Sequence, residues 1–460
     1  MFGFMKRERG FYRRIFSLAA PIMLQNLVTS TLAMADTFMV GLLGEVPMAG
    51  VTLANIPMYA LQMFFFGVQS GSAVLISQYW GKGDRKAINR VLGLSWLVMG
   101  AVSVTVAAVL LVIPRQVMGL FSNDPAAVAV AARYGRIVGV SYVFNSFTLA
   151  YLGAHRSMEN PRLGLYMLSA SMLTNTLLNW VLIFGKLGAP ALGVEGAAIA
   201  TLIARCVEFA IMMGHIGLGR HFRVDLSAVL RPGREAARKL FKYATPVILN
   251  ETLWGIGIGL FPTIMGHMEN STEILAAYTV TGNVEKLAMA ALIGLAGTAA
   301  IVVGREIGAG NRDTVYEVGL ALNVLSVFLG VAVGGVLGVL TWRVLPRYVF
   351  PLFQMSGSTR SIASMMLYVV CVTMGAKAFN HTNIIGVLRG GGDVRAATVI
   401  DLVPLWLVAI PLAALVGLVF QWGIFWVYVS MSLDQIAKFF LGVARLRSGA
   451  WINDLTVTEG

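Results

Sequence analysis

A single acidic residue inside an apolar stretch is the first feature that could support chemistry. Asp36 lies within the apolar run 16–43, which is long enough to cross a bilayer because a span needs about 20 mainly apolar residues. At helical spacing, Gln25, Thr29 and Asp36 share one face of this run. An ionised carboxylate near the bilayer centre costs at least about 2.5–3.5 kcal/mol, so Asp36 should face protein or water.

This acid is predicted to bind an exchanged cation, either a proton or Na⁺. Burial away from water favours the neutral acid, whereas amide hydrogen bonds or a bound cation favour the carboxylate. A modest rearrangement of its neighbours would then let Asp36 gain its ion on one side of the membrane and release it on the other. The alternative is a carboxylate that only joins packed helices. Ionisable residues within spans are more often functional, which favours the first interpretation.

A later apolar run carries side chains that suit this acid. Ser171, Asn175 and Asn179 follow one another at spacings of four and therefore lie on one face of a helix. Thr201, on the next predicted helix, can join them. Polar side chains of this kind also hold transmembrane helices together without any role in transport, and both interpretations fit the spacing equally.

The second half of the chain has ionisable residues of its own within apolar runs. Glu251 lies about one turn after Pro246, where a broken backbone would help to open the helix. Glu251, Glu285 and Lys377 cannot all face lipid, so at least one buried ion pair is expected. Glu251 is predicted to contribute to a translocation path. The further residues assigned to a substrate path are Gln25, Trp254, Glu285, Lys377 and His381.

The composition places these residues in a polytopic α-helical membrane protein. The chain has 460 residues, of which 57% are hydrophobic and only 12% charged, and its mean hydropathy is +0.76, which excludes an ordinary soluble domain. Its net charge of +13 comes largely from basic residues in short loops. These loops are typical of the cytoplasmic side of a membrane protein, so no nucleic-acid partner is expected.

The apolar runs predict an all-α fold with twelve transmembrane helices. The basic opening followed by an apolar run resembles a signal peptide, but no small-residue cleavage site follows, so a retained first helix is expected. Cys206 and Cys371 fall within apolar runs, which predicts no disulfide framework. The predicted helices cover residues 16–43, 47–79, 91–112, 130–154, 163–184, 194–217, 246–267, 275–307, 318–344, 362–387, 396–419 and 423–443.

Short matches between the two halves predict an internal duplication. Pro21 and Pro246 lie in similar strings at an offset of 225 residues, and the segment ending at Arg156 resembles the segment ending at Arg389. Weak matches in a constant order are typical of old transporter repeats. The predicted lobes are 1–219 and 243–460, joined by a basic cytoplasmic linker at 220–242. Each lobe would contain six helices.

The basic residues also predict the orientation in the membrane. The N-terminus, the 81–90 and 156–162 loops, the 220–242 linker and the C-terminal end are basic, whereas the intervening connections are poor in Lys and Arg. The positive-inside rule therefore predicts a multi-pass protein of the cell membrane with both termini in the cytoplasm.

Several catalytic signatures are absent from the sequence. Two Gly-x-Gly-Asp strings end at Asp84 and Asp393, but both lie at basic loops, so they are interpreted as glycine turns followed by helix-capping residues rather than protease motifs. No Walker A, His-Glu-x-x-His or Cys/His cluster is present. The sequence therefore favours a protein that is not an enzyme and needs no cofactor beyond its coupling ion.

Several strings together are similar to the multidrug and toxic compound extrusion (MATE) transporters. The resemblance spans nearly the whole chain and rests on Ala-Pro-Ile-Met-Leu-Gln-Asn, Ala-Asp36-Thr-Phe-Met-Val-Gly, Gln78-Tyr-Trp-Gly-Lys-Gly-Asp, Asn179-Trp-Val-Leu-Ile-Phe-Gly and Leu388-Arg-Gly-Gly-Gly-Asp. It implies a V-shaped, two-lobed antiporter of twelve helices that exports organic cations against inward Na⁺ or H⁺.

The resemblance also implies roles for individual residues. Asp36 matches the first-helix acid of a cation site, with Asn175 and Thr201 as its partners, and Glu251 matches an acid used in one branch. Asn179 departs from that pattern, because one branch has Asp there. The tenth helix departs as well, because it offers Lys377 and His381 instead of an acid, which leaves both Na⁺ and H⁺ open and does not assign the coupling site to one lobe.

The resulting functional hypothesis is secondary active efflux. Small organic, cationic compounds would be exported from a monomer in the lipid bilayer in exchange for Na⁺ or H⁺, with Asp36 as the Na⁺ ligand if the ion is a metal. One alternative is a flippase for lipid-linked precursors from the same wider superfamily, although twelve helices and few basic residues within the membrane favour efflux. A membrane-embedded enzyme would need a paired catalytic constellation, which the sequence does not contain.

Overall fold

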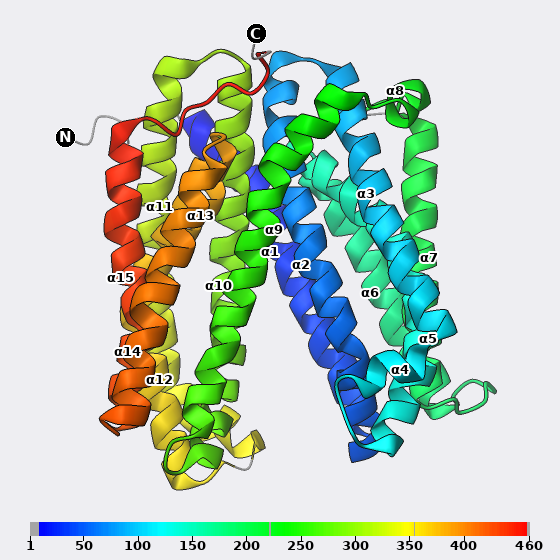
Figure 1. The fold of residues 1–460 in the computed structure, drawn as a ribbon, viewed down its shortest axis with the longest axis vertical. Helices are drawn as coiled ribbons and strands as arrows, with labels where there is room; N and C mark the ends of the chain where they lie inside the picture. The colour runs from blue at the N-terminus through cyan, green and yellow to red at the C-terminus, as the bar shows by residue number, and fades with distance from the viewer. Residues whose placement is uncertain (1–8, 220–221, 354, 458–460) are drawn as a thin grey trace. The chain divides into compact units, whose positions relative to one another are not determined.

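The computed structural model describes residues 9–219, 222–353 and 355–457, and every regular element among them is a helix (Figure 1). Twelve helices in this part of the chain are long and apolar enough to cross a membrane, which confirms the predicted all-α fold. The long helices are α1 (Arg9–Gly41), α2 (Glu45–Lys82), α3 (Arg85–Val112), α5 (Pro125–Ser157), α6 (Pro161–Phe184), α7 (Val194–Leu218), α9 (Arg234–Gly266), α10 (Ser271–Gly308), α11 (Arg312–Val339), α12 (Gly357–His381), α13 (Val394–Pro404) and α15 (Ile424–Ser448).

Shorter segments extend or connect these helices. Four π-helical segments continue long helices of the second half, and the spans of α11, α12 and α13 include such segments. The short elements are α4 (Pro114–Gly119), α8 (Leu226–Leu230), η2 (Leu340–Val349), η3 (Phe350–Phe353), η4 (Thr382–Leu388), η5 (Leu405–Ala409), α14 (Ile410–Ala414) and η6 (Leu415–Val419).

Helix lengths support the predicted duplication. α2 and α10 each have 38 residues, α3 and α11 each have 28, and α7 and α15 each have 25. The packing repeats as well. α5 packs against α2, α3 and α7, and its counterpart α12 packs against α10, α11 and α15. The two halves of the sequence therefore fold in the same way.

The chain divides into two compact units. One comprises Leu24–Ile248 and is called here the N-terminal unit; the other joins the residues up to Met23 to those from Leu249 onward and is called the C-terminal unit. Both boundaries fall inside continuous helices, α1 and α9. The lobes 1–219 and 243–460 stay a prediction, and residues 220 and 221 of the predicted linker lie outside the described residues.

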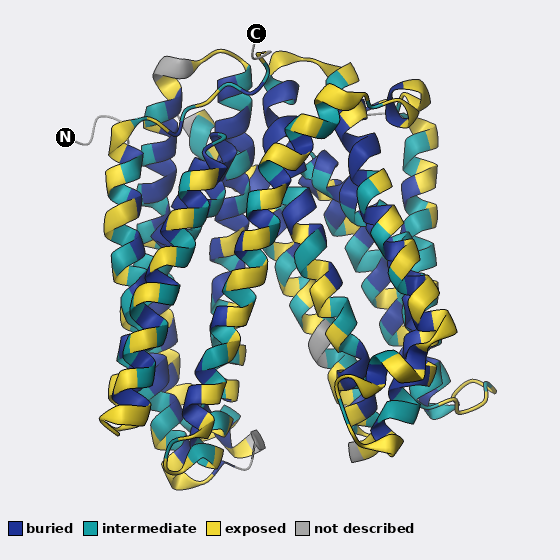
Figure 2. Cartoon of the chain, viewed as in Figure 1, coloured by how far each residue is buried: buried dark blue, intermediate teal, exposed yellow. Residues whose placement is uncertain are grey.

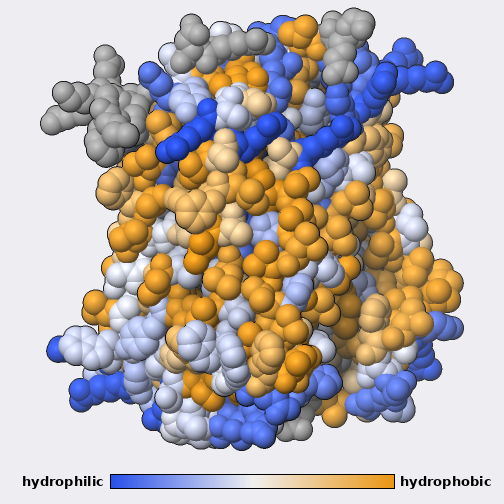
Figure 3. Space-filling view, turned by 60° about the vertical axis from the view of Figure 1, so that its left-hand side comes forward, coloured by the Kyte–Doolittle hydropathy of each residue, from blue (hydrophilic) through white to orange (hydrophobic). Residues whose placement is uncertain are grey.

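Each unit has an apolar interior and an apolar outer surface. Tyr142 and Phe65 are buried in the core of the N-terminal unit, and Trp451 and Leu322 in that of the C-terminal unit. Exposed positions alternate with buried ones along the helices (Figure 2), and many exposed side chains are large and apolar, such as Val372 at 86% exposure. Figure 3 shows a broad apolar band between more hydrophilic ends, as expected for a surface in contact with lipid.

The two Gly-x-Gly-Asp strings form left-handed glycine turns, as predicted. Gly83 has φ 79° and Gly392 has φ 87°, a conformation that favours glycine. Asp84 caps α3 by accepting a hydrogen bond from the Ala87 amide at 3.0 Å. The capping prediction is wrong for Asp393. Its carboxylate instead lies 2.6 Å from Nε of Arg445, a charged partner that binds a carboxylate more strongly than a backbone amide does.

Candidate functional site

Asp36 lies at the end of a chain of hydrogen bonds within the N-terminal unit. Asn179 donates from Nδ2 to Oδ1 of Asp36 at 2.7 Å and to Oδ1 of Asn175 at 3.0 Å. Asn175 donates in turn to the hydroxyl of Thr201 at 3.3 Å. The structure therefore brings together four of the residues predicted from the sequence, and it gives Asp36 a direct amide partner.

Three helices position this group. α1 carries the acid, α6 presents Asn175 and Asn179 on one face because the residues are one turn apart, and α7 supplies Thr201. Both asparagines are almost fully buried, at 3% and 1% exposure, so their amides must find polar partners within the protein. Ser171 shares their face but bonds to the carbonyl of Ala204 at 3.4 Å, away from Asp36.

A buried tyrosine extends the site beyond the predicted residues. The side chain of Tyr134, on α5, lies close to Thr201, and its ring lies in the core of the N-terminal unit. Thr201 also donates to the carbonyl of Ala197 at 3.0 Å. Sequence spacing gave no signal for Tyr134, which shares its helix with none of the predicted site residues.

An ion pair lies beside the acid. Arg205 Nη1 and Glu208 Oε2 are 2.6 Å apart on α7, and the Glu208 side chain is fully buried. Arg205 is close enough to interact electrostatically with Asp36. This pair was not among the residues predicted from the sequence, although two opposite charges three residues apart in an apolar run were a signal for it. Glu208 neutralises Arg205 and so limits the effect of the guanidinium on a cation at Asp36.

The oxygen atoms of the group suit a proton or a hard monovalent cation. The carboxylate of Asp36, the amide oxygens and the Thr201 hydroxyl are ligands of the type that hard cations prefer. Oδ1 of Asn179 is buried and makes no hydrogen bond within the described part of the chain. No group of three or more His, Cys, Asp or Glu side chains that could hold a metal ion occurs among those residues. The assignment of Na⁺ to Asp36 stays a prediction.

Gln25 hydrogen-bonds to residues outside the Asp36 group. Its Nε2 donates to the carbonyl of Pro161 at 2.5 Å, and its Oε1 accepts from Nη2 of Arg156 at 2.9 Å. Gln25 precedes Asp36 by eleven residues on α1, which is about 16 Å along a helix axis at 1.5 Å per residue. Its assignment to a substrate path stays a prediction.

The C-terminal unit contains the expected ion pairs. Lys377 Nζ lies 2.5 Å from Oε1 of Glu285, and Arg389 donates from both terminal nitrogens to Oε1 of Glu251 at 3.1 Å. The prediction of at least one buried ion pair is confirmed. The expected break at Pro246 is wrong, because α9 stays helical through this residue; an internal proline can be tolerated when neighbouring helices satisfy the freed backbone groups.

Two further path residues also lie in the C-terminal unit. Trp254 packs against an apolar cluster that includes Phe261 and Leu405. His381 ends α12 and lies within electrostatic range of Lys377 and Asp401. The assignments of Glu251, Trp254 and His381 to a translocation path stay predictions.

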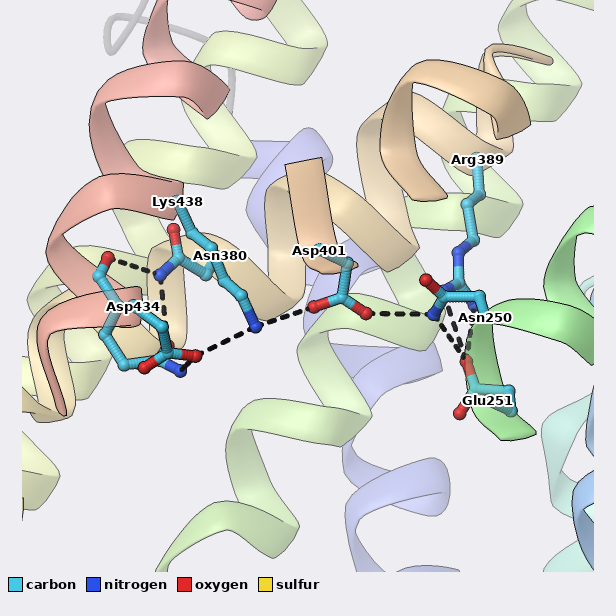
Figure 4. Close-up of polar contacts among 8 residues, drawn as sticks. Asn250, Glu251, Asn380, Arg389, Asp401, Asp434 and Lys438 are labelled. Carbon is cyan, nitrogen blue, oxygen red and sulfur yellow. Dashed lines mark hydrogen bonds and ion pairs between the residues drawn. The ribbon is translucent and has the colours of Figure 1, made fainter. Parts of the chain in front are cut away.

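The Glu251 pair belongs to a longer polar network (Figure 4). Asn250 donates from Nδ2 to Asp401 at 2.9 Å and to Glu251 at 3.3 Å. Lys438 then bridges Asp401 at 2.9 Å and Asp434 at 3.0 Å. The pair on α15 was not among the residues predicted from the sequence, although Asp434 and Lys438 are four residues apart within the last apolar run.

Comparison with known proteins decides the family. The family model MatE matches residues 21–181 and 248–415, which is most of the chain. The chain belongs to the MatE family. Membership makes it a membrane transporter rather than an enzyme.

Curated MatE relatives match almost end to end. A probable multidrug resistance protein NorM from Thermotoga maritima is 23% identical, and the match covers 97% of this chain and 94% of the relative. A probable multidrug resistance protein NorM from Bradyrhizobium diazoefficiens is 27% identical, with 94% and 92% covered. An uncharacterized transporter, YisQ of Bacillus subtilis, is 23% identical, with 95% and 94% covered.

Solved structures show the same fold at low sequence identity. An outward-facing multidrug resistance MATE family transporter of the MOP superfamily superposes with a TM-score of 0.84 at 18% identity, covering 95% of this chain and 96% of that one. The eukaryotic MATE transporter AtDTX14 gives 0.82 at 15% identity, with 96% of each chain covered. A MOP superfamily transporter from Pyrococcus furiosus gives 0.84 at 19% identity, covering 95% and 96%.

Proposed function

We propose that this MatE-family chain is a secondary active exporter of small organic, cationic compounds that exchanges them for a proton or Na⁺ bound at Asp36. The observation that carries this proposal is the 2.7 Å hydrogen bond from Asn179 to Asp36, continued through Asn175 to Thr201. A carboxylate in an apolar helix with an amide partner can hold a cation or a proton and exchange it.

Each residue of the group has a distinct role in this mechanism. Asp36 carries the ion, and Asn179 orients the carboxylate and stabilises its ionised form by donating to it. Asn175 and Thr201 fix the orientation of the Asn179 amide. When the ion leaves, the Asn179 donor keeps the carboxylate partnered, so loss of the ion does not leave a buried charge without a hydrogen bond.

The cargo is proposed from the relatives and from the charges of the chain itself. Several MatE relatives are named multidrug resistance proteins. The alternative cargo is a lipid-linked or other anionic metabolite, since the Pyrococcus furiosus transporter of similar fold is described as having a binding pocket of reverse polarity that suggests a different function. Cations within the described spans are mostly paired with carboxylates, as in Arg205–Glu208, Lys377–Glu285 and Arg389–Glu251, which favours cationic cargo.

Dye efflux from proteoliposomes tests the proposal. With the purified full-length protein and ethidium inside the vesicles, an inward pH gradient or an inward Na⁺ gradient is imposed separately. Asp36→Asn should bind dye and remain folded but lose gradient-driven export, and Asn179→Ala should weaken it. Ser171→Ala is the matched control, because Ser171 shares the helical face of the asparagines but bonds only to a backbone carbonyl within the described chain. Export by Asp36→Asn at the parental rate under both gradients would overturn the coupling role.

The orientation belongs to the same proposal. Both termini lie in the cytoplasm, because the N-terminus, the 81–90 and 156–162 loops and the 220–242 linker, which fall on one side, are rich in basic residues. A cysteine introduced at Glu269 should react with a membrane-impermeant reagent added to intact cells, and one at Leu230 should not; both side chains are exposed. Strong labelling at position 230 in sealed cells would reverse the orientation.

A further inference from the structure

Charged side chains from α9, α13 and α15, together with Arg389 at the end of η4, form one continuous network inside the C-terminal unit (Figure 4). It begins at Arg389, passes through Glu251 and Asn250 of α9 to Asp401 of α13, and ends on Lys438 and Asp434 of α15. Gln435 donates to Asp434 at 2.9 Å, and Asn380 donates to Gln435 at 3.1 Å. The two cations are removed from water, with side-chain exposures of 1% for Arg389 and 3% for Lys438, and the carboxylates are mostly buried, at 15% for Glu251, 17% for Asp401 and 6% for Asp434.

The charges of this network do not balance. Arg389 and Lys438 supply two positive charges, whereas Glu251, Asp401 and Asp434 supply three negative charges when ionised. The excess is one negative charge. A buried charge without compensation is unfavourable by several kcal/mol, about 3–5 kcal/mol when one partner of a pair is missing. The network therefore has room for one additional monovalent cation.

Neighbouring ionisable groups do not remove this excess. On the adjoining helices, Lys377 pairs with Glu285, and Asp393 pairs with Arg445, so each pair is neutral. His381, at the end of α12, is the remaining ionisable group known to interact electrostatically with Asp401 and Lys438. The imidazole and the Glu251 carboxylate are thus the alternative carriers of a proton, and an experiment must distinguish both from the aspartates.

The position that a metal cation would need is already filled. Nζ of Lys438 lies between the two aspartates, 2.9 Å from Oδ1 of Asp401 and 3.0 Å from Oδ2 of Asp434. An ammonium group so placed repels a second cation at the same carboxylates. A proton avoids this conflict because it binds covalently to one carboxylate oxygen and leaves the other carboxylate as the counter-ion of Lys438.

Asn250 can offer Asp401 a hydrogen-bond partner whether or not Asp401 carries the extra proton. Its side chain is fully buried, and Nδ2 donates to Asp401 and Glu251 while Oδ1 has no hydrogen-bond partner among the described residues. A protonated Asp401 becomes a donor. Rotation of the Asn250 amide would then present the unused Oδ1 as its acceptor. An unused buried acceptor beside a surplus carboxylate is the second observation that points to a proton.

We propose that Asp401, Lys438 and Asp434 form a proton-binding site of the C-terminal unit, separate from Asp36. A proton from water joins a carboxylate oxygen of Asp401 or Asp434, and the remaining carboxylate keeps its ion pair with Lys438. The inference goes beyond the proposed function, because it requires neither Asp36 nor a particular exported compound. It adds a second place in the chain where an imposed pH gradient can act.

Infrared spectroscopy of the full-length protein in lipid bilayers tests this site without transport. Protein made with aspartate carrying ¹³C in the side-chain carboxyl group identifies the C=O band of protonated aspartic acid, which an ionised carboxylate lacks. The Asp36→Asn background removes the other described aspartate in the interior of a predicted span. The expected result is a label-sensitive acid band at mildly acidic pH that disappears as the pH is raised.

Three variants in this background sharpen the test. Asp401→Asn/Asp434→Asn should abolish the band. Lys438→Met should increase it, because loss of the ammonium raises the excess from one negative charge to two. Asp393→Asn is the matched control and should leave the band unchanged, because Asp393 forms a simple one-to-one pair with Arg445.

Two results would overturn the site. One is the persistence of the band in the double variant. The other is the absence of a label-sensitive band in the Asp36→Asn background at any pH from mildly acidic to mildly alkaline, which would place the proton on Glu251, on His381 or nowhere in the network. The second result needs neither network variant, so misfolding of those variants does not block the test. Loss of dye efflux bears on the proposed function and leaves this measurement unaffected.

Discussion

Two repeat-related arginines should differ in their importance for stability. Arg156 of the N-terminal unit donates to the neutral side chain of Gln25, whereas Arg389 of the C-terminal unit donates to the carboxylate of Glu251. Both arginines end the repeated glycine-containing segment of their half of the sequence. We predict that Arg389→Met destabilises the protein more than Arg156→Met, because only the first leaves a charge without its partner.

The structure sets the size of this difference. Arg389→Met leaves the Glu251 carboxylate, whose side chain is 15% exposed, with the single amide donor of Asn250, and removing one member of a buried ion pair costs roughly 3–5 kcal/mol. Arg156→Met leaves a neutral acceptor on Gln25 without its charged donor, which costs roughly 1–3 kcal/mol. The expected difference in the free energy of unfolding is therefore about 2 kcal/mol.

Thermal survival of the purified full-length protein is the suitable assay, since large membrane proteins often unfold irreversibly. The folded fraction remaining after a fixed heat step is measured by size-exclusion chromatography in detergent. Arg389→Met should lose its folded fraction at a lower temperature than Arg156→Met. Glu251→Gln, which makes the C-terminal pair resemble the N-terminal one, should partly rescue Arg389→Met.

The rescue is the decisive comparison. If Glu251→Gln fails to improve Arg389→Met, or if the two arginine variants are equally unstable, the unpaired charge of Glu251 is not the cause. Arg389 would then stabilise the unit through packing of its long side chain alone.

Two further predictions concern backbone positions. Gly390→Ala should destabilise the protein by about 1–3 kcal/mol through overpacking and so lower the yield of folded protein, because the new Cβ would lie 2.8 Å from the Cα of Ala300. Gly282→Ala is the control and should be tolerated, because the space around its Cβ is open. Equal yields of the two variants by size-exclusion chromatography would contradict the prediction. The pKa of Asp225, which caps α8, is lowered mainly by the side-chain hydrogen bond with Ser227. The cap is therefore complete above the ordinary Asp pKa and is lost as the pH falls through the lowered pKa. Hydrogen exchange of the Ser227 amide, corrected for its intrinsic rate, should show this loss in the parent protein. The same amide should show no pH dependence in Asp225→Asn.

Helical periodicity was sufficient to predict the central contact of the candidate site. Asp36 within an apolar run must face protein, and Asn175 and Asn179 one turn apart must share a face. Their pairing follows because a buried acid and buried amides both need partners, and the structure places Asn179 against Asp36 at 2.7 Å. The twelve spans and the duplication were predictable for a similar reason, since hydropathy and repeated turns are local features.

Contacts that depend on helix arrangement were not predictable in this way. Tyr134 reaches the site from α5 through Thr201, and no spacing within one helix encodes that contact. Asp434 and Lys438 were visible as an ion pair at helical spacing, but their joint contact with Asp401 requires α13 and α15 to be packed together. The continuous helix at Pro246 was mispredicted because a proline in water breaks a helix more readily than one supported by neighbouring helices.

The C-terminal unit is built from two segments far apart in the sequence, and this has a consequence for biosynthesis. Its core joins Ile15 and Leu18, near the start of the chain, to Leu446 and Trp451, near its end. Trp451 is fully buried, and the adjoining Asn453 amide donates to the carbonyl of Gly391 at 2.8 Å. The N-terminal unit is one uninterrupted segment of the chain and can pack while translation continues, because domains generally fold as units from the N-terminus. The other core can close only after Leu446 and Trp451 have left the ribosome, so the start of α1 must wait in the membrane while more than 400 residues are synthesised.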